Sequence, residues 1–312
     1  MLRNYKIFYQ LYNFFYKSKL QHNLAHYKRF GIAKSYFSSV SSEDFKNIKS
    51  PVNLYDAKDS FIEMPKDPNF NSLGENVKSA LLPWSKNGYV ILDQFFNSAE
   101  IEAFNTEVEN LISTKKAKFK NDKIMFAIHD SKLLTSAGNH TKVHTILEVL
   151  LGKRVELFQS INFLKGSQQR THSDSIHMTT FPYGNMIAIW IALEDINADC
   201  GPLHYYPGSH KLPFVFNRHF GNVGSKHKLG DQTYGAYEDC IETLVKKHSL
   251  KKKVFLAKKG DLLIWHSNLL HGGEKVNKPN STRKSMVFHY YTNDAICFHE
   301  ITQRPSLKMN LI

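Results

Sequence analysis

Apolar and polar positions change their spacing about halfway along this 312-residue chain. In the first half, apolar side chains tend to recur every three or four positions, which is the period of a helix that packs on one side. From residue 155 on, they gather in short runs of β-branched and aromatic residues separated by turn residues, as strands do. Helices followed by many short strands predict an α+β chain with a double-sheet jelly-roll core.

In the first half, the pattern predicts helices over residues 76–87, 101–112 and 142–151, and a strand over residues 88–92. The second helix has a start signal, because Asn97 stands three positions before Glu100, the spacing of a capping box. In the second half, we expect strands at 155–164, 169–178, 186–193, 202–206, 254–257, 261–266 and 285–292. The polar, basic stretch at about 214–253 is expected to form an insertion over one end of the core.

The first 42 residues contain seven basic residues and no acidic residue. Aromatic residues at positions 5, 8, 9, 12, 15 and 16 follow the spacing of an amphipathic helix. We expect this helix to dock its aromatic face on the main domain. Two alternatives stay open. The helix could lie on an anionic membrane surface with Lys6, Lys17 and Lys19 toward the headgroups, or it could be a targeting peptide of the kind that mitochondrial presequences form.

Proline residues interrupt the stretch that follows, at Pro51, Pro65 and Pro68. Proline breaks long regular elements, so this stretch is interpreted as a linker or a wrapped segment. We therefore expect residues 1–70 to be a basic, aromatic N-terminal segment with its linker. Residues 71–312 are expected to form the main domain.

Composition and charge narrow the classes of function. The chain is 42% hydrophobic with only 16 glycines and 10 prolines, which excludes collagen-like and disordered proteins. Its net charge of +13 favours anionic partners, but no recognition module accompanies it, so we expect no nucleic-acid partner. Cys200, Cys240 and Cys297 are an odd, scattered set, which indicates a reducing compartment and a cytoplasmic location. The longest clean apolar run, 186–193, is far shorter than the roughly 18 residues of a membrane span.

A candidate metal site begins with His172 and Asp174, which are two positions apart. On a strand, such residues point to the same face, so their side chains would project side by side. A second cluster follows an apolar strand, where His271 precedes two glycines and Arg283 stands twelve residues farther on. Two histidines and one carboxylate form the facial triad of non-haem Fe(II) oxygenases. An arginine on a neighbouring strand can hold a distal carboxylate with two hydrogen bonds, as an iron-bound 2-oxo acid requires.

With these residues, the chain resembles the phytanoyl-CoA dioxygenase family of Fe(II)- and 2-oxoglutarate-dependent oxygenases from about residue 84 to residue 292. The matching segments, in chain order, are Gly88-Tyr-Val-Ile-Leu-Asp-Gln-Phe-Phe96, His172-Ser-Asp174, Trp190-Ile-Ala-Leu-Glu194, Cys200-Gly-Pro-Leu203, Pro207-Gly-Ser-His-Lys211 and His271-Gly-Gly273 with Arg283. The resemblance implies a double-stranded β-helix fold (jelly-roll or cupin-like) with N-terminal helices packed against it. It also implies Fe(II) as the metal, 2-oxoglutarate as the co-substrate and O₂ as the oxidant. It covers neither the first 60 or so residues nor the insertion.

By this resemblance, His172, Asp174 and His271 are the expected iron ligands, and Arg283 is the expected partner of 2-oxoglutarate. Relatives that halogenate carry a small residue at the position of Asp174, so the carboxylate kept here favours hydroxylation. The expected reaction is hydroxylation of a small-molecule or carrier-bound substrate with release of succinate and CO₂.

Further residues are expected around the co-substrate. Ser285 falls on the same strand face as Arg283 and would add a hydroxyl to the bound carboxylate. Trp190 and Lys165 stand where relatives place residues near 2-oxoglutarate, although a packing aromatic and a surface lysine would explain them equally well. The substrate pocket is expected to include His177, His289 and Tyr291. His266 is the rival of His271 as a ligand, but we expect it to lie within the strand.

Two other classes of function remain open. The basic aromatic start would suit a catalytically inactive jelly-roll binding protein that contacts a membrane peripherally. A hydrolase or isomerase with a cupin-like metal site is the other alternative, but it leaves Arg283 without a role. The sequence does not specify the substrate or the oligomeric state.

Overall fold

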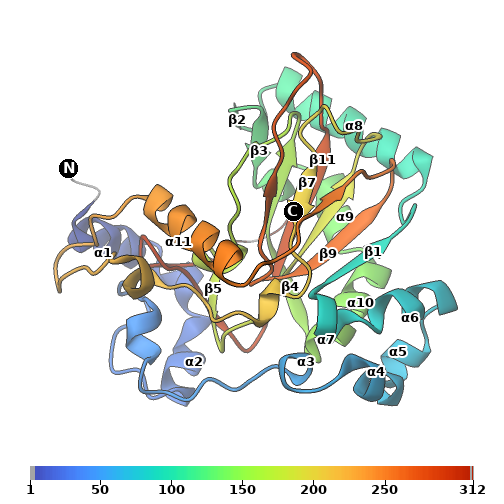
Figure 1. Cartoon of the computed structure of the whole chain (residues 1–312). Helices are drawn as coiled ribbons and strands as arrows, with labels where there is room; N and C mark the ends of the chain where they lie inside the picture. The colour runs from blue at the N-terminus through green and yellow to red at the C-terminus, as the bar shows by residue number, and fades with distance from the viewer. Residues whose placement is uncertain (1–3, 310, 312) are drawn as a thin grey trace.

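Three antiparallel sheets form the core of the protein in the computed structural model, which describes residues 4–309 and 311 (Figure 1). The main sheet has seven strands in the order β1-β9-β6-β11-β4-β3-β2, and the two smaller sheets have the orders β10-β7-β8 and β13-β12-β5. The strands are Tyr89–Leu92 (β1), Phe119–Lys120 (β2), Lys123–Met125 (β3), Val155–Phe163 (β4), Thr179–Phe181 (β5), Met186–Ala192 (β6), Leu203–Tyr205 (β7), Lys253–Phe255 (β8), Leu262–His266 (β9), His271–Gly273 (β10), Ser285–Thr292 (β11), Ile296–His299 (β12) and Arg304–Pro305 (β13).

The helices lie mainly in the first half of the chain, as the apolar period predicts. They are Lys6–Phe15 (α1), Asn23–Arg29 (α2), Leu54–Ala57 (α3), Ser60–Glu63 (α4), Pro68–Asn71 (α5), Glu75–Leu81 (α6), Trp84–Asn87 (α7), Ser98–Ser113 (α8), Lys132–Gly138 (α9), Thr141–Leu151 (α10) and Tyr234–Lys247 (α11). The capping box at the start of α8 is confirmed, since Asn97 and Glu100 each accept a hydrogen bond from the other's backbone N–H.

Strand β6 shows how the main sheet is buried on both faces. Its isoleucines Ile187, Ile189 and Ile191 pack into a cluster with side chains of α8, α9 and α10. The alternate residues Ala188 and Trp190 face a second cluster, toward β7 and β8 of the small sheet. A strand that is covered on both faces has a continuous run of apolar residues in its sequence. Burial of each isoleucine side chain contributes roughly 1.5–3 kcal/mol to the stability of the fold. The expected α+β jelly-roll core with packed helices is confirmed.

Two local predictions are wrong. Residues 169–178 form no strand; a single β-bridge joins His172 to His271, and a 3₁₀ helix begins at Asp174. The helix expected over 76–87 is interrupted at Pro83, where proline supplies no N–H for a continuous ladder. The expected insertion contains a helix, α11, that packs Tyr237 and Ile241 into a cluster of its own.

The segment before residue 71 wraps around the core. Its Tyr27, Val40 and Phe45 pack with side chains of β5 and β12, and other residues of the segment join the large helix-sheet cluster. The buried carboxylate of Glu300 accepts hydrogen bonds from the backbone N–H and the hydroxyl of Ser42, at 2.9 and 2.6 Å, and so ties the segment to the end of β12. The domain boundary at residues 70 and 71 stays a prediction.

Helix α1 forms where its spacing predicts, but its expected orientation is wrong. The apolar face of the helix does not dock on the main domain: the side chains of Phe8, Leu11 and Phe15 are exposed, while Asn13 is buried. Among the described residues, no helix combines the length and the hydropathy that crossing a bilayer requires.

Candidate active site

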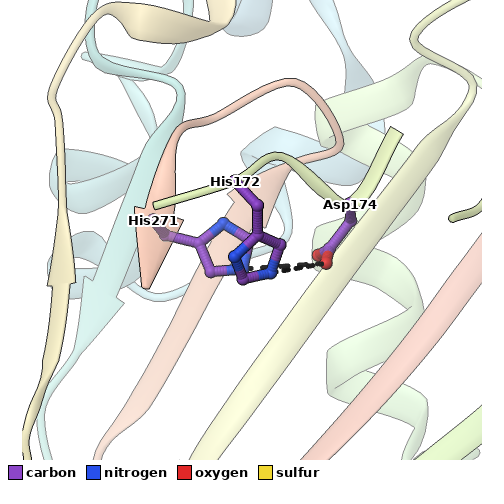
Figure 2. Close-up of side chains that lie close together, drawn as sticks. All are labelled: His172, Asp174 and His271. Carbon is purple, nitrogen blue, oxygen red and sulfur yellow. Dashed lines mark ion pairs between the residues drawn. The ribbon is translucent and has the colours of Figure 1, made fainter. Parts of the chain in front are cut away.

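Three buried side chains from two distant parts of the chain converge at one place (Figure 2). His172 precedes the 3₁₀ helix, Asp174 is its first residue, and His271 begins β10. The Nε2 atoms of His172 and His271 lie 3.8 and 3.7 Å from the same carboxylate oxygen, Oδ1 of Asp174. The potential ligand atoms of all three lie within 4.8 Å of one another. The tight turn therefore brings Asp174 beside His172 although no strand carries them.

Backbone contacts orient both imidazoles. The Nδ1 atom of His172 lies 2.9 Å from the carbonyl oxygen of Arg170, and that of His271 lies 3.0 Å from the carbonyl oxygen of Leu269. An imidazole that donates its Nδ1–H to a carbonyl presents a lone pair at Nε2, the form that binds a metal. The two backbones are joined in turn, because His172 and His271 exchange N–H···O hydrogen bonds of 2.9 Å in each direction.

The glycines after His271 allow the chain to approach this closely. A Cβ atom on Gly272 would lie 2.8 Å from the carbonyl oxygen of Gln169, and one on Gly273 would lie 2.8 Å from Oγ of Ser167. Any side chain at these positions would push the stretch that carries His172 away from β10.

The carboxylate of Asp174 is held from its other oxygen. The indole Nε1–H of Trp265 donates a hydrogen bond of 2.7 Å to Oδ2, and His289 Nε2 lies 3.6 Å from the same atom. Burial alone would raise the pKa of Asp174, but His271, His289 and His172 together outweigh it and lower that pKa. Burial, followed by the neighbouring His271, lowers the pKa of His172 to about 3. At neutral pH the site thus presents a carboxylate and a neutral imidazole, the protonation states of metal ligands.

Arg283 lies on the wall of the same cavity as a buried cation. Its guanidinium carbon is 5.3 Å from the ring centre of Phe163 and 5.8 Å from that of Trp190, and its Nη1 donates a hydrogen bond of 3.0 Å to Oγ of Ser285. Burial lowers the pKa of Arg283 to about 10, so the group stays charged at neutral pH. Among the described residues, no carboxylate pairs with it, and its Nε and the indole Nε1 of Trp190 have no hydrogen-bond partner. A buried cation without a directly paired carboxylate is costly, so this place fits an anion.

The cavity that joins the triad to Arg283 has a volume of about 530 Å³. His177 and His289 line it, as expected, together with Trp190. Residues that were not anticipated also line it, among them His299 from β12 and Tyr234 from α11. The insertion therefore contributes directly to the pocket.

Two expected residues lie elsewhere. Lys165 fits the alternative of a surface lysine, because its half-exposed ammonium lies 3.6 Å from Asp122 and it does not line the cavity. Tyr291 shares the strand face of His289, but one step farther along it packs against Met186 and Cys297 and does not line the cavity. The alternation of residues along a strand tells which face of the sheet a side chain points to. Its position along the strand decides whether it reaches the cavity.

The rival histidine, His266, also lies outside the cavity. Its Nε2 is 3.5 Å from Oδ1 of Asp56, and its Nδ1 accepts the backbone N–H of Asn268 at 3.1 Å. Its neighbour Trp265, by contrast, points into the site, which the sequence analysis missed. The alternation of residues along the strand could have identified Trp265, since Trp265 and Leu263 are alternate residues of β9 and both pack on the inner side of the sheet.

Comparisons with known proteins agree with this geometry. The sequence profile described as phytanoyl-CoA dioxygenase (PhyH) matches residues 84–285. A phytanoyl-CoA dioxygenase domain-containing protein 1 homolog of Caenorhabditis briggsae is 22% identical over 253 residues, covering 78% of this chain and 84% of the relative. Another relative is the peroxisomal phytanoyl-CoA dioxygenase of Bos taurus, 24% identical over 245 residues, with 69% of this chain and 68% of the relative covered.

A solved structure shares the fold. The non-heme alpha ketoglutarate dependent carbocyclase SnoK from nogalamycin biosynthesis superposes with a TM-score of 0.58 at 19% identity, covering 73% of this chain and 87% of SnoK. The family profile covers about two thirds of the chain, and all three residues of the triad lie within its range. The chain therefore belongs to the phytanoyl-CoA dioxygenase family, and with it to the non-haem Fe(II)- and 2-oxoglutarate-dependent dioxygenases.

Proposed function

We propose that this protein hydroxylates a small-molecule or carrier-bound substrate, with Fe(II) as its metal, 2-oxoglutarate as co-substrate, and succinate and CO₂ as further products. One observation carries the proposal: a buried His-Asp-His triad and a buried, uncompensated arginine share the wall of one cavity. A buried cluster of metal-ligating side chains and a buried unpaired cation both lower the stability of a fold unless they bind a ligand. Together they provide the ligands for a metal and a cationic partner for a dicarboxylate.

The donor set fits a divalent first-row metal. His172 and His271 offer Nε2 lone pairs, since their Nδ1 atoms face backbone carbonyls, and Asp174 offers Oδ1. Two nitrogens and one carboxylate leave coordination positions open for further oxygen ligands. Trp265 would keep Asp174 oriented through its hydrogen bond to Oδ2.

The other end of the cavity fits the distal carboxylate of 2-oxoglutarate. Arg283 would bind it through its guanidinium N–H groups, and the Ser285 hydroxyl, now accepting from Arg283, would orient that guanidinium or donate to the ligand. When bound, Fe(II) with 2-oxoglutarate and O₂ supplies the oxidation, in which one oxygen atom enters a substrate C–H bond and the other enters succinate.

The remaining walls would bind the substrate and exclude water. Burial lowers the pKa of His177 to about 4 and that of His299 to about 3, so both imidazoles are neutral at physiological pH. The neutral imidazoles and the Tyr234 hydroxyl suit a polar group on the part of the substrate that enters the cavity. A volume of about 530 Å³ falls in the ordinary range of small-ligand pockets, so a larger carrier would remain outside.

We also propose that the protein works in a reducing compartment, the cytoplasm being the simplest one. Cys200 and Cys297 are buried free thiols, and Cys240 is a half-buried one. Fractionation of cells that express the tagged full chain tests this location, and recovery from a secreted fraction would contradict it.

The proposed chemistry is tested by anaerobic addition of Fe(II) with and without 2-oxoglutarate. A metal-to-ligand charge-transfer absorption band that needs both is expected, together with succinate formation in air. Arg283→Ala and His271→Ala should abolish the band. His266→Gln is the matched control, because it alters a buried histidine near His271 that does not face the cavity. Folded protein without a band, or a band that persists in His271→Ala, would contradict the proposal.

A further inference from the structure

Helix α1 presents its apolar side to solvent. The side chains of Ile7, Phe8, Leu11, Phe14 and Phe15 are exposed by 52, 45, 50, 48 and 78%. At about 100° per residue, these five positions fall within one continuous stripe along the helix. Soluble proteins rarely leave such a contiguous apolar surface uncovered unless it contacts another molecule.

The polar side of α1 faces the protein instead. Asn13 is 1% exposed and donates a hydrogen bond of 3.0 Å to the carbonyl oxygen of Phe37. The guanidinium of Arg304 lies over the rings of Tyr9 and Tyr12, at 5.4 and 5.1 Å. Polar contacts therefore hold the helix in an orientation that leaves its apolar stripe outward.

Cations border this stripe. The ammonium groups of Lys17 and Lys19 lie over the rings of Phe14 and Tyr16, at 4.9 and 5.4 Å. No acidic residue occurs before Glu43 in the sequence. A second copy of the chain would bring an equally basic surface to the same place, which like-charge repulsion disfavours. An anionic lipid surface offers both the apolar layer and the negative charge.

The helix is also anchored to the loop that leads to the pocket. The backbone N–H of Lys6 donates to the carbonyl oxygen of His227, and that of Leu229 donates to the carbonyl oxygen of Asn4, at 2.9 and 2.8 Å. This loop continues into α11, which places Tyr234 on the cavity wall. A surface bound by α1 would therefore lie near the insertion that covers the site.

We propose that α1 is an interfacial helix that docks the protein on an anionic lipid bilayer. Its apolar stripe would enter the boundary between headgroups and acyl chains, and Lys17 and Lys19 would contact lipid phosphates and carboxylates. The helix lies on the membrane and does not cross it. This role is independent of the metal and of the proposed reaction.

Co-sedimentation of the full-length protein with vesicles tests the proposal. The vesicles contain phosphatidylcholine alone or phosphatidylcholine mixed with phosphatidylserine. Binding is expected to the mixed vesicles and to weaken with added salt, because the charged part of the attraction is screened. The double variant Leu11→Ser/Phe15→Ser should lower the partition coefficient by about tenfold or more, because two exposed apolar groups no longer enter the bilayer.

The matched control is Phe61→Ser/Ile62→Ser. These residues are 52 and 61% exposed on α4, far from α1 in Figure 1, so the control removes similar apolar groups from another surface. Its binding should equal that of the wild type. A variant with Phe15→Trp adds direct evidence: the three native tryptophans are at most 3% exposed, so a blue shift of emission with mixed vesicles reports insertion at residue 15.

Three results would overturn the proposal. The first is the absence of vesicle binding by folded protein, and the second is equal binding to both kinds of vesicle. The third is a dimer in sedimentation velocity that Leu11→Ser/Phe15→Ser dissociates, since the stripe would then be a protein interface. None of these results depends on the metal or on turnover, so the outcome is separate from the test of the proposed function.

Discussion

Replacing Arg283 by methionine is expected to weaken 2-oxoglutarate binding strongly without weakening the fold. The side chain is buried between Phe163 and Trp190, and a methionine of similar length keeps most of this packing. The substitution removes the charge that the cavity leaves uncompensated. The free energy of unfolding should therefore stay the same or rise, while the affinity for 2-oxoglutarate should fall.

The structure sets the size of each effect. Burial lowers the pKa of Arg283 from 12.5 to about 10, which corresponds to a penalty of about 3 kcal/mol on the charged form in the folded state. Since both states are protonated at pH 7, this penalty is fully present there, and methionine relieves it. The lost hydrogen bond to Ser285 offsets about 1.5–3 kcal/mol of the gain. The free energy of unfolding without ligand should thus be unchanged or rise by about 1–2 kcal/mol.

Binding should change much more. Truncating one partner of a buried, hydrogen-bonded charge pair costs about 2–5 kcal/mol, so the KM for 2-oxoglutarate should rise by about thirtyfold or more. Ligand at about one hundred times the wild-type Kd should raise the unfolding free energy of the wild type by about 2.7 kcal/mol, and this increment should fall to about 0.9 kcal/mol or less in the variant. Ser285→Ala removes only the hydroxyl beside the guanidinium and should have an intermediate effect.

Urea unfolding of the metal-loaded protein, with and without 2-oxoglutarate, measures both quantities, and succinate formation gives the KM. The reasoning is refuted if Arg283→Met unfolds far more easily than the wild type in the absence of ligand, because Arg283 would then be a structural residue. An unchanged KM for 2-oxoglutarate in a folded variant would refute it as well.

Three further predictions concern other parts of the structure. Trp265→Phe keeps the aromatic packing but removes the 2.7 Å hydrogen bond to the carboxylate of the triad, so iron affinity should fall by about 10–100-fold in a metal titration, while unchanged affinity would argue against an orienting role. Gly260→Ala should destabilise the protein by about 1–3 kcal/mol or more in urea unfolding, because Gly260 has φ +91 and a Cβ there would meet a backbone carbonyl oxygen; wild-type stability would contradict this. Burial lowers the pKa of His210 and of His299 to about 3, so the unfolded chain binds more protons than the folded protein below pH 6.5. The free energy of unfolding of the metal-free protein should therefore fall by about 2 kcal/mol per histidine between pH 6.5 and 5. A free energy of unfolding that does not change over this pH range would count against neutral buried histidines.

The identity of the candidate ligands was readable from the sequence, although the predicted local structure was wrong. His172 and Asp174 converge through a 3₁₀ turn instead of a strand, and the same two residues reach the site. What brings His271 to them is the backbone bridge to His172, across almost a hundred residues of chain. Residue types specify the chemistry of a site, whereas long-range pairing decides which atoms meet.

Local periodicity determined which residues share a face, because the period of a helix or strand is a property of the backbone alone. It explained why alternate residues of β6 pack into two different clusters, and it explained the existence of α1. It did not determine which face meets the rest of the protein. In α1 that choice rests on Asn13 bonding to Phe37 and Arg304 covering two tyrosines, contacts with residues far along the chain. Tertiary structure alone likewise placed Lys165 at the surface and Trp265 against the triad, since such contacts depend on partners that no local pattern contains.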